Sequence, residues 1–132
     1  MLLSLLLSVS ALACPDLSGT FTACATAKGP MDVDRIEISQ SGIQLKYTSY
    51  DKKGKMSQGS YVADGAVRVV DNLTLSTASC TQEAYVIVTD REVPQLGRRI
   101  KVQQRYYRAG ENLRVDISLE NNAAVTASCR RL

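Results

Sequence analysis

The feature that most constrains the fold is an alternation of apolar and polar side chains that recurs along most of the chain. Residues 35–39 read RIEIS, residues 43–50 read IQLKYTSY and residues 113–120 read LRVDISLE. Successive side chains of a β-strand point to opposite faces, so this spacing predicts strands with one buried face. After residue 13, no window of ten or more residues has the spacing of an amphipathic helix. We therefore predict an all-β domain.

Turn residues separate these runs at short intervals. Asp64 and Gly65 form a two-residue hairpin signal, because both residue types tolerate the positive φ that such turns require. Gly42, Gly54 and Gly110 lie in further turn sequences. We predict nine strands, at 19–26, 34–39, 43–50, 55–63, 66–70 running on to 75, 79–89, 98–108, 113–120 and 123–129.

The short turns also predict the topology. Strands adjacent in sequence should pair, which gives an antiparallel up-and-down meander of eight or nine strands. Open edges promote aggregation, which favours closure into a barrel, with a two-sheet sandwich as the alternative. Residues 85–88, YVIV, are apolar on both faces. We expect the outer side of this strand to be covered or to lie at a dimer contact.

The first 13 residues, MLLSLLLSVSALA, contain no charged residue and end in Ala11-Leu12-Ala13. Signal peptidase accepts small residues at the first and third of these positions, so we predict cleavage after Ala13 and one mature domain, residues 14–132. The apolar run is shorter than the roughly 20 residues of a membrane-spanning helix. We expect export to the periplasm or secretion, without a transmembrane anchor. A lipid anchor on Cys14 is the alternative, although the preceding residues fit the lipoprotein motif poorly.

The mature chain contains an even number of cysteines, namely Cys14, Cys24, Cys80 and Cys129. In a small exported protein they predict two disulfides, each of which typically stabilises the fold by about 2–4 kcal/mol. Three pairings are possible. We prefer Cys14 with Cys24 and Cys80 with Cys129, because the first pair would close a short loop at one rim.

Several classes of chemistry are excluded. The chain has no histidine, which removes Ser-His-Asp and Cys-His catalysis and every imidazole metal site. The cysteines lack the paired spacing of a zinc site, and no glycine-rich phosphate loop is present. Asp32 and Asp34 are the closest approach to a catalytic carboxylate pair, but they follow a Gly-Pro turn sequence and should be solvated. We expect no enzyme activity, no metal and no cofactor.

The sequence GRRIKVQQRYYR, residues 97–108, is unusually basic, and we call it the basic strand. Arg99, Lys101 and Arg105 share one of its faces and could bind an anionic protein partner. The simpler interpretation, which we favour, is a solvated outer face whose cations pair with carboxylates such as Asp116 and Glu120. We expect no nucleic acid, because no stacking aromatic residues are interleaved with these cations.

The opposite face carries a few polar side chains among apolar ones, and so does the strand at 43–50. Such a mixture is typical of small-molecule sites, although polar tips at a barrel mouth give the same pattern. We predict a ligand site that contains Tyr47, Ser49, Gln104 and Tyr106.

Residues 16–21, DLSGTF, resemble the opening of the lipocalin family, in which Gly, any residue and Trp begin the first strand. Phe21 has the place of the Trp. The resemblance implies a barrel of eight strands that binds a small apolar ligand. It also implies that the aromatic ring closes one end under an Arg near the last strand, Arg130 or Arg131. The chain is nearer in size to avidin-like or fatty-acid-binding-like barrels.

A second, more distant resemblance is to the periplasmic C-type lysozyme inhibitors, on residues 21–24 and on the Ser-Gly-Tyr pattern within 57–61. These resemblances lead to two functional hypotheses. The first is an exported lipocalin-like protein that binds a small apolar or amphipathic ligand. The alternative is a protein-binding module, an inhibitor or an envelope-surface adaptor, that acts through loops or the basic strand.

Overall fold

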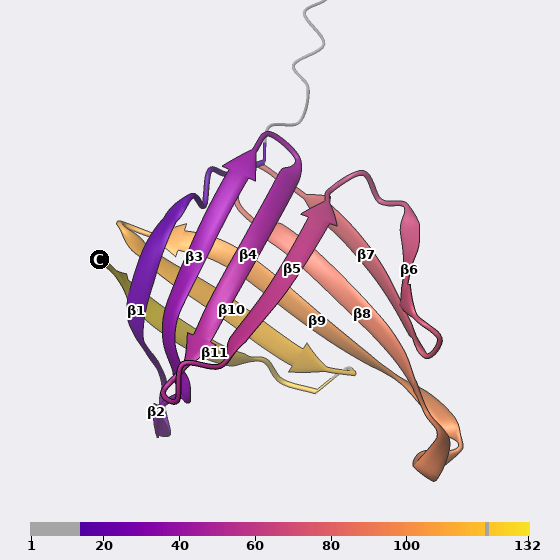
Figure 1. Cartoon of the computed structure of the whole chain (residues 1–132). Coiled ribbons are helices and arrows are strands. Elements are labelled where there is room, and N and C mark those ends of the chain that lie inside the picture. The colour runs from indigo at the N-terminus through magenta and orange to yellow at the C-terminus, as the bar shows by residue number, and fades with distance from the viewer. Residues whose placement is uncertain (1–13, 121) are drawn as a thin grey trace, which may run out of the picture.

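The computed structural model describes residues 14–120 and 122–132, so the predicted signal peptide lies outside the described residues. Within them the chain forms eleven strands and one short 3-10 helix (Figure 1). In chain order the elements are β1 (Gly19–Thr26), β2 (Gly29–Pro30), β3 (Val33–Ser41), β4 (Gln44–Asp51), β5 (Met56–Val62), β6 (Val67–Asp71), β7 (Thr74–Cys80), β8 (Tyr85–Val93), η1 (Pro94–Leu96), β9 (Arg98–Ala109), β10 (Asn112–Leu119) and β11 (Val125–Arg131). The predicted all-β class is confirmed.

The strands form one antiparallel sheet in the order β5-β4-β3-β1-β11-β10-β9-β8-β7-β6, with β2 paired to β1. This is the predicted meander, and it is a single curled sheet rather than a sandwich (Figure 1). The curl brings the first long strand against the last, with Phe21 of β1 opposite Arg131 of β11. The two free edges are β5 and β6, in the middle of the chain. The molecule is therefore a half-barrel that opens between β5 and β6.

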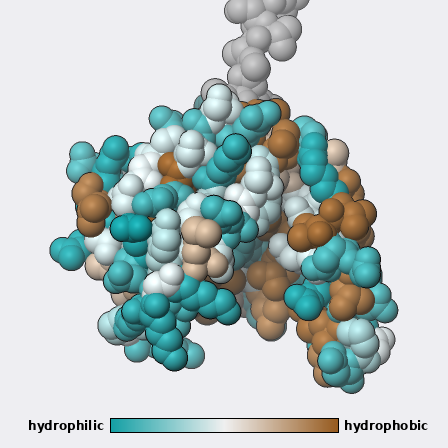
Figure 2. All heavy atoms as spheres, viewed as in Figure 1, coloured by the Kyte–Doolittle hydropathy of each residue, from teal (hydrophilic) through white to brown (hydrophobic). Residues whose placement is uncertain are grey.

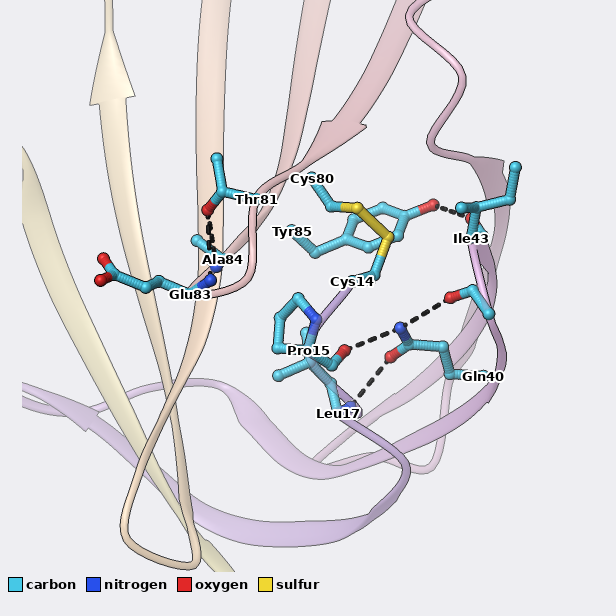
Figure 3. Close-up of a disulfide and its surroundings, with 11 residues drawn as sticks. Cys14, Pro15, Leu17, Gln40, Ile43, Cys80, Thr81, Glu83, Ala84 and Tyr85 are labelled. Atoms are coloured by element: carbon cyan, nitrogen blue, oxygen red, sulfur yellow. Dashed lines mark hydrogen bonds between the residues drawn. A yellow bond between two sulfur atoms is a disulfide. The ribbon is translucent and has the colours of Figure 1, made fainter. Parts of the chain in front are cut away.

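The hydrogen-bonded path has ten strands where nine were predicted, because two turns carry no glycine. The segment expected to run from 66 to 75 is a hairpin of β6 and β7, in which the Asp71 carboxylate accepts the Leu73 N–H. Residues 81–84 interrupt the predicted strand 79–89, and the Thr81 hydroxyl accepts the N–H of Ala84 there (Figure 3). In both turns an Asp or Thr side chain accepts a hydrogen bond from a nearby backbone N–H, which stabilises the turn without a glycine.

The core lies inside the curl. Its most buried large side chains, each at most 1% exposed, are Leu17, Phe21, Tyr85, Ile87 and Leu113. Tyr85 and Ile87 point inward from β8, whereas the intervening Val86 and the next residue, Val88, face outward and are half-buried. The outer side of this strand is therefore partly covered, which was one of the two expectations for it, and the dimer contact stays a prediction.

Both disulfides differ from the pairing that we preferred from the sequence. Cys24 of β1 bonds Cys129 of β11, and Cys14 bonds Cys80 at the end of β7 (Figure 3). Cys24 and Cys129 are close because the first and last strands pair, which short loops along the sequence do not predict. The two bonds indicate a non-reducing compartment. A Cys14 sulfur held in a disulfide leaves no thiol for the alternative lipid anchor.

The segment before β1 crosses one end of the half-barrel and is held there by Gln40 of β3. The Leu17 N–H donates to Gln40 Oε1 at 2.9 Å, and Gln40 Nε2 donates to the Pro15 carbonyl at 2.8 Å (Figure 3). These bonds, together with the Cys14–Cys80 disulfide, make this the closed end of the half-barrel.

An arginine also lies against Phe21 at the closed end, but it is not one of the two that the lipocalin resemblance implied. The Arg108 guanidinium of β9 lies 5.8 Å from the centre of the Phe21 ring. It also donates hydrogen bonds to the carbonyls of Asp16 (3.0 Å) and Ser18 (2.9 Å). Arg131 is the residue paired with Phe21 on the adjacent strand β11. The arginine that lies over the ring comes instead from β9, which is three strands from β1 in the sheet.

Candidate functional site

A cavity of about 100 Å³ lies inside the curl. Its walls come from six strands, β1, β3, β4, β9, β10 and β11, together with Met31 between β2 and β3. Eight of the lining residues are apolar or belong to the Cys24–Cys129 disulfide. The other four are Tyr47, Ser49, Gln104 and Tyr106, so the structure brings together all four residues that were predicted to form a ligand site.

The four polar residues converge because each pair is spaced two apart on one strand. Tyr47 and Ser49 point inward from β4, and Gln104 and Tyr106 point inward from β9. The Tyr47 and Ser49 hydroxyls share a hydrogen bond of 3.2 Å. The Tyr106 hydroxyl donates to Gln104 Oε1, also at 3.2 Å. Hydrogen-bonding groups therefore stand on two facing walls of an apolar chamber.

The environment of these groups disfavours negative charge. Burial raises the pKa of Tyr106 above its usual value of 10.0, and the nearby phenols of Tyr47 and Tyr61 raise it further. Burial likewise raises the pKa of Tyr61. The surroundings of Tyr106 and Tyr61 therefore favour the neutral phenol, which acts as a hydrogen-bonding group. None of the residues lining this cavity is charged.

The cavity reaches the surface. Six of its lining side chains, including Ser49 and Gln104, are only half-buried. A second hollow, a cleft of about 320 Å³, lies between β5 and β6 and includes Tyr61. Hydrophobic atoms gather over β6, where Val69 is 75% exposed (Figure 2). An uncovered apolar surface, formed by Val67, Val69 and Val70, therefore lies beside the open edge of the half-barrel.

Gly59 and Tyr61 of β5 line the cleft between β5 and β6 and pack beside Tyr47 of the cavity, and sequence reasoning gave them no place near the site. A Cβ at position 59 would lie 2.9 Å from the Tyr61 ring and 3.0 Å from the Tyr47 ring, so the glycine makes room for two tyrosines. The strand spacing places both residues on one face, but the sequence MSQGSYV has no apolar–polar alternation that would have shown which face is inward. Residues 57–61, which carry the lysozyme-inhibitor resemblance, lie within β5, as the strand predicted at 55–63 implied.

Three arginines of the basic strand form ion pairs with carboxylates of neighbouring segments on the outer face of the sheet. Arg99 bonds Asp90 at 2.8 Å, and Arg105 lies 3.7 Å from Asp116, one of the two carboxylates that were predicted as partners. The other, Glu120, pairs with Arg98 rather than with the three predicted cations. Exposed pairs of this kind contribute about 0–1 kcal/mol each.

Arg99 and Lys101 also line an outer depression of about 300 Å³, which Arg105 does not reach. Asp32 and Asp34 are exposed, as expected for solvated carboxylates. Over residues 14–120 and 122–132, no group of three or more Cys, Asp or Glu side chains is placed to hold a metal ion. In the same part of the chain, no helix has the length and apolar character that crossing a bilayer requires.

No protein-family model matches the chain, and no curated protein matches it by sequence. Similar solved structures include a mutant and the wild type of the fluorescent protein UnaG, at 14% and 12% identity and TM-scores of 0.64 and 0.63. Each comparison covers 88% of this chain, with 96% of the mutant and 97% of the wild type.

A third similar structure is the REP1-NXSQ fatty acid transporter, at 13% identity and a TM-score of 0.60, covering 89% of this chain and 96% of that one. At these identities the likeness shows the fold alone. It supports a calycin-like barrel, the broader group of the first resemblance, and not the lipocalins specifically. The fold of this chain therefore resembles that of calycin-type β-barrels.

Proposed function

We propose that this protein is an exported binding protein that holds a small apolar or amphipathic ligand in the cavity between β4 and β9. The observation that carries the proposal is the convergence of two polar pairs, Tyr47 with Ser49 and Gln104 with Tyr106, on an otherwise apolar chamber. A few placed polar groups in an apolar concavity are the usual composition of a small-molecule site. Binding rather than catalysis also accords with the fatty acid transporter among the similar structures.

The size of the cavity limits the ligand. Its volume of about 100 Å³ is below the roughly 300–1,000 Å³ of sites for drug-sized molecules and nearer the roughly 150 Å³ of a cavity that binds benzene. The enclosed part of the ligand is therefore one ring or a short chain, and any remainder extends to solvent. For so few enclosed atoms we expect a Kd between roughly 1 µM and 1 mM.

Export is the second part of the proposal. The charge-free leader that ends in Ala13 and the two disulfides of the mature chain support it. A binding protein outside the cytoplasm meets ligands from the surroundings, and the disulfides hold the half-barrel together where no reducing system protects free thiols. Mass spectrometry of protein purified from its natural source tests this part, with Cys14 expected as the first residue.

NMR titration tests the binding function. Linear alcohols from butanol to decanol should give saturable shifts at the lining residues, with affinity that rises with chain length and levels off when the cavity is full. Ser49→Phe, which fills the cavity, should abolish binding. Thr48→Phe is the matched control, because Thr48 is the neighbouring residue of β4 and faces outward. Absence of saturable shifts, or equal loss in the two variants, would refute the proposal.

A further inference from the structure

We infer that the ligand of this cavity is electrically neutral and presents a hydrogen-bond acceptor, such as a carbonyl or hydroxyl oxygen, rather than a carboxylate. The inference rests on the proposed function and names the class of molecule that the same site selects. Its basis is the charge and the hydrogen-bonding state of the groups around the cavity.

A carboxylate in this cavity would have no positive charge to pair with. The lining residues contain no Lys or Arg. Arg108, an inward-facing cation of β9, is bound to the carbonyls of Asp16 and Ser18 at the closed end. Arg105, one residue from Gln104 and Tyr106, faces outward toward Asp116. A charge removed from water without a partner is strongly disfavoured, whereas a neutral polar group needs only a hydrogen bond.

Hydrogen-bond donors remain free on both walls of the cavity, beside hydroxyl oxygens that can still accept. Gln104 Oε1 already accepts the Tyr106 hydroxyl, and the Gln104 amide NH₂ has no hydrogen-bond partner among the described residues. Tyr47 and Ser49 share one hydrogen bond, so one of their two hydroxyl hydrogens stays available. A carbonyl or hydroxyl oxygen on the ligand can accept a hydrogen bond from the donors on β4 or from those on β9.

Tyr106 in the wall of the cavity, and Tyr61 in the cleft between β5 and β6, indicate the same preference. Burial, the largest cause, raises the pKa of Tyr106 and of Tyr61, so the surroundings favour the neutral phenol over the phenolate. A ligand carboxylate placed among the same groups experiences the same penalty.

Benzamide and benzoate provide a matched pair of probes, since they are nearly identical in size and differ in charge at pH 7. We expect benzamide to bind at least about tenfold more tightly in an NMR titration of the full mature protein. Benzoate should gain affinity as the pH is lowered toward 4, where the carboxyl group becomes protonated. Benzoate that binds as tightly as benzamide at pH 7 would overturn the inference.

Substitutions of Gln104 locate the effect. Gln104→Lys places a cation in the cavity and should shift the preference toward benzoate. Gln104→Met removes the amide donors while keeping an unbranched side chain, and should weaken benzamide but not toluene. Gln103→Lys is the matched control, because Gln103 is exposed on the outer face of β9, and it should change neither affinity.

The outcomes separate this inference from the proposed function. If the linear alcohols bind but benzamide and benzoate bind equally, the inference fails and the binding function stands. If neither the alcohols nor benzamide and toluene give saturable shifts at the lining residues, the proposed function fails and the inference fails with it. If Gln104→Met weakens toluene as much as benzamide, the residue acts through packing and the donor argument is wrong.

Discussion

Removal of the Cys24–Cys129 disulfide should be among the most destabilising changes available in this protein. This bond closes a sequence separation of 105 residues, and the Cys14–Cys80 bond closes 66. Loop-closure entropy in the unfolded chain then corresponds to about 4.8 kcal/mol for the longer loop and about 4.3 kcal/mol for the shorter one. Cys24 and Cys129 are also buried, at 3% and 1% exposed, so alanine would leave a void between β1 and β11.

The paired variant Cys24→Ala/Cys129→Ala should therefore lose slightly more unfolding free energy than Cys14→Ala/Cys80→Ala. Each loss, expected at about 3–5 kcal/mol, is a large part of the 5–15 kcal/mol typical of a domain. Urea unfolding followed by circular dichroism and tyrosine fluorescence measures both. The midpoint and the slope should be reported together, because an unfolded chain without cross-links exposes more surface.

The pairing itself provides the decisive control. The crossed variant Cys14→Ala/Cys24→Ala keeps Cys80 and Cys129, which the structure places in different disulfides, and it should contain two free thiols by mass spectrometry. For the wild type, chymotrypsin can cut after Leu17 and Phe21 and so separates Cys14 from Cys24, whereas no Lys or Arg lies between them for trypsin. A Cys80–Cys129 bond in the crossed variant with wild-type stability, or a Cys14–Cys24 peptide from the wild type, would refute the reasoning.

Two further predictions concern buried aromatic residues. Phe21→Ala, at a position that is 0% exposed beneath Arg108, should lower the unfolding free energy by about 3–5 kcal/mol in urea unfolding, and a loss below 1 kcal/mol would contradict the closed end described above. Burial raises the pKa of Tyr85 to about 12 from its usual 10.0, so its contribution to stability is present below pH 10 and is lost as the pH rises toward 12. Unfolding measured across that range should show the decline, Tyr85→Phe should flatten it, and an unchanged slope in that variant would assign the decline to other groups.

The ligand-site residues could be found from the sequence because the signal is local. Tyr47 and Ser49, like Gln104 and Tyr106, continue an apolar face at a spacing of two, and a strand keeps such residues on one side wherever it lies in the sheet. Tyr61 lies on the same face as Ser57 and Gly59 in the sequence MSQGSYV. Because neither of these residues is a large apolar one, the sequence did not show that this face is the inner one. The role of Gly59, which is to leave room for the Tyr47 ring, could not be predicted, because Tyr47 belongs to the neighbouring strand.

The sequence by itself determined the secondary structure class, the turns that contain glycine, and the inner side of the strands whose apolar and polar residues alternate. These are short-range properties, set by side-chain alternation and by residues that tolerate positive φ. The predicted barrel closure implied that the first and last strands meet. Only the tertiary structure decided the register of β1 against β11, that the sheet opens between β5 and β6, and that Arg108 rather than Arg130 or Arg131 lies over Phe21. It also decided both disulfides. The physical reason is that the curl of the whole sheet brings distant segments together, and no local pattern records how far a sheet curls.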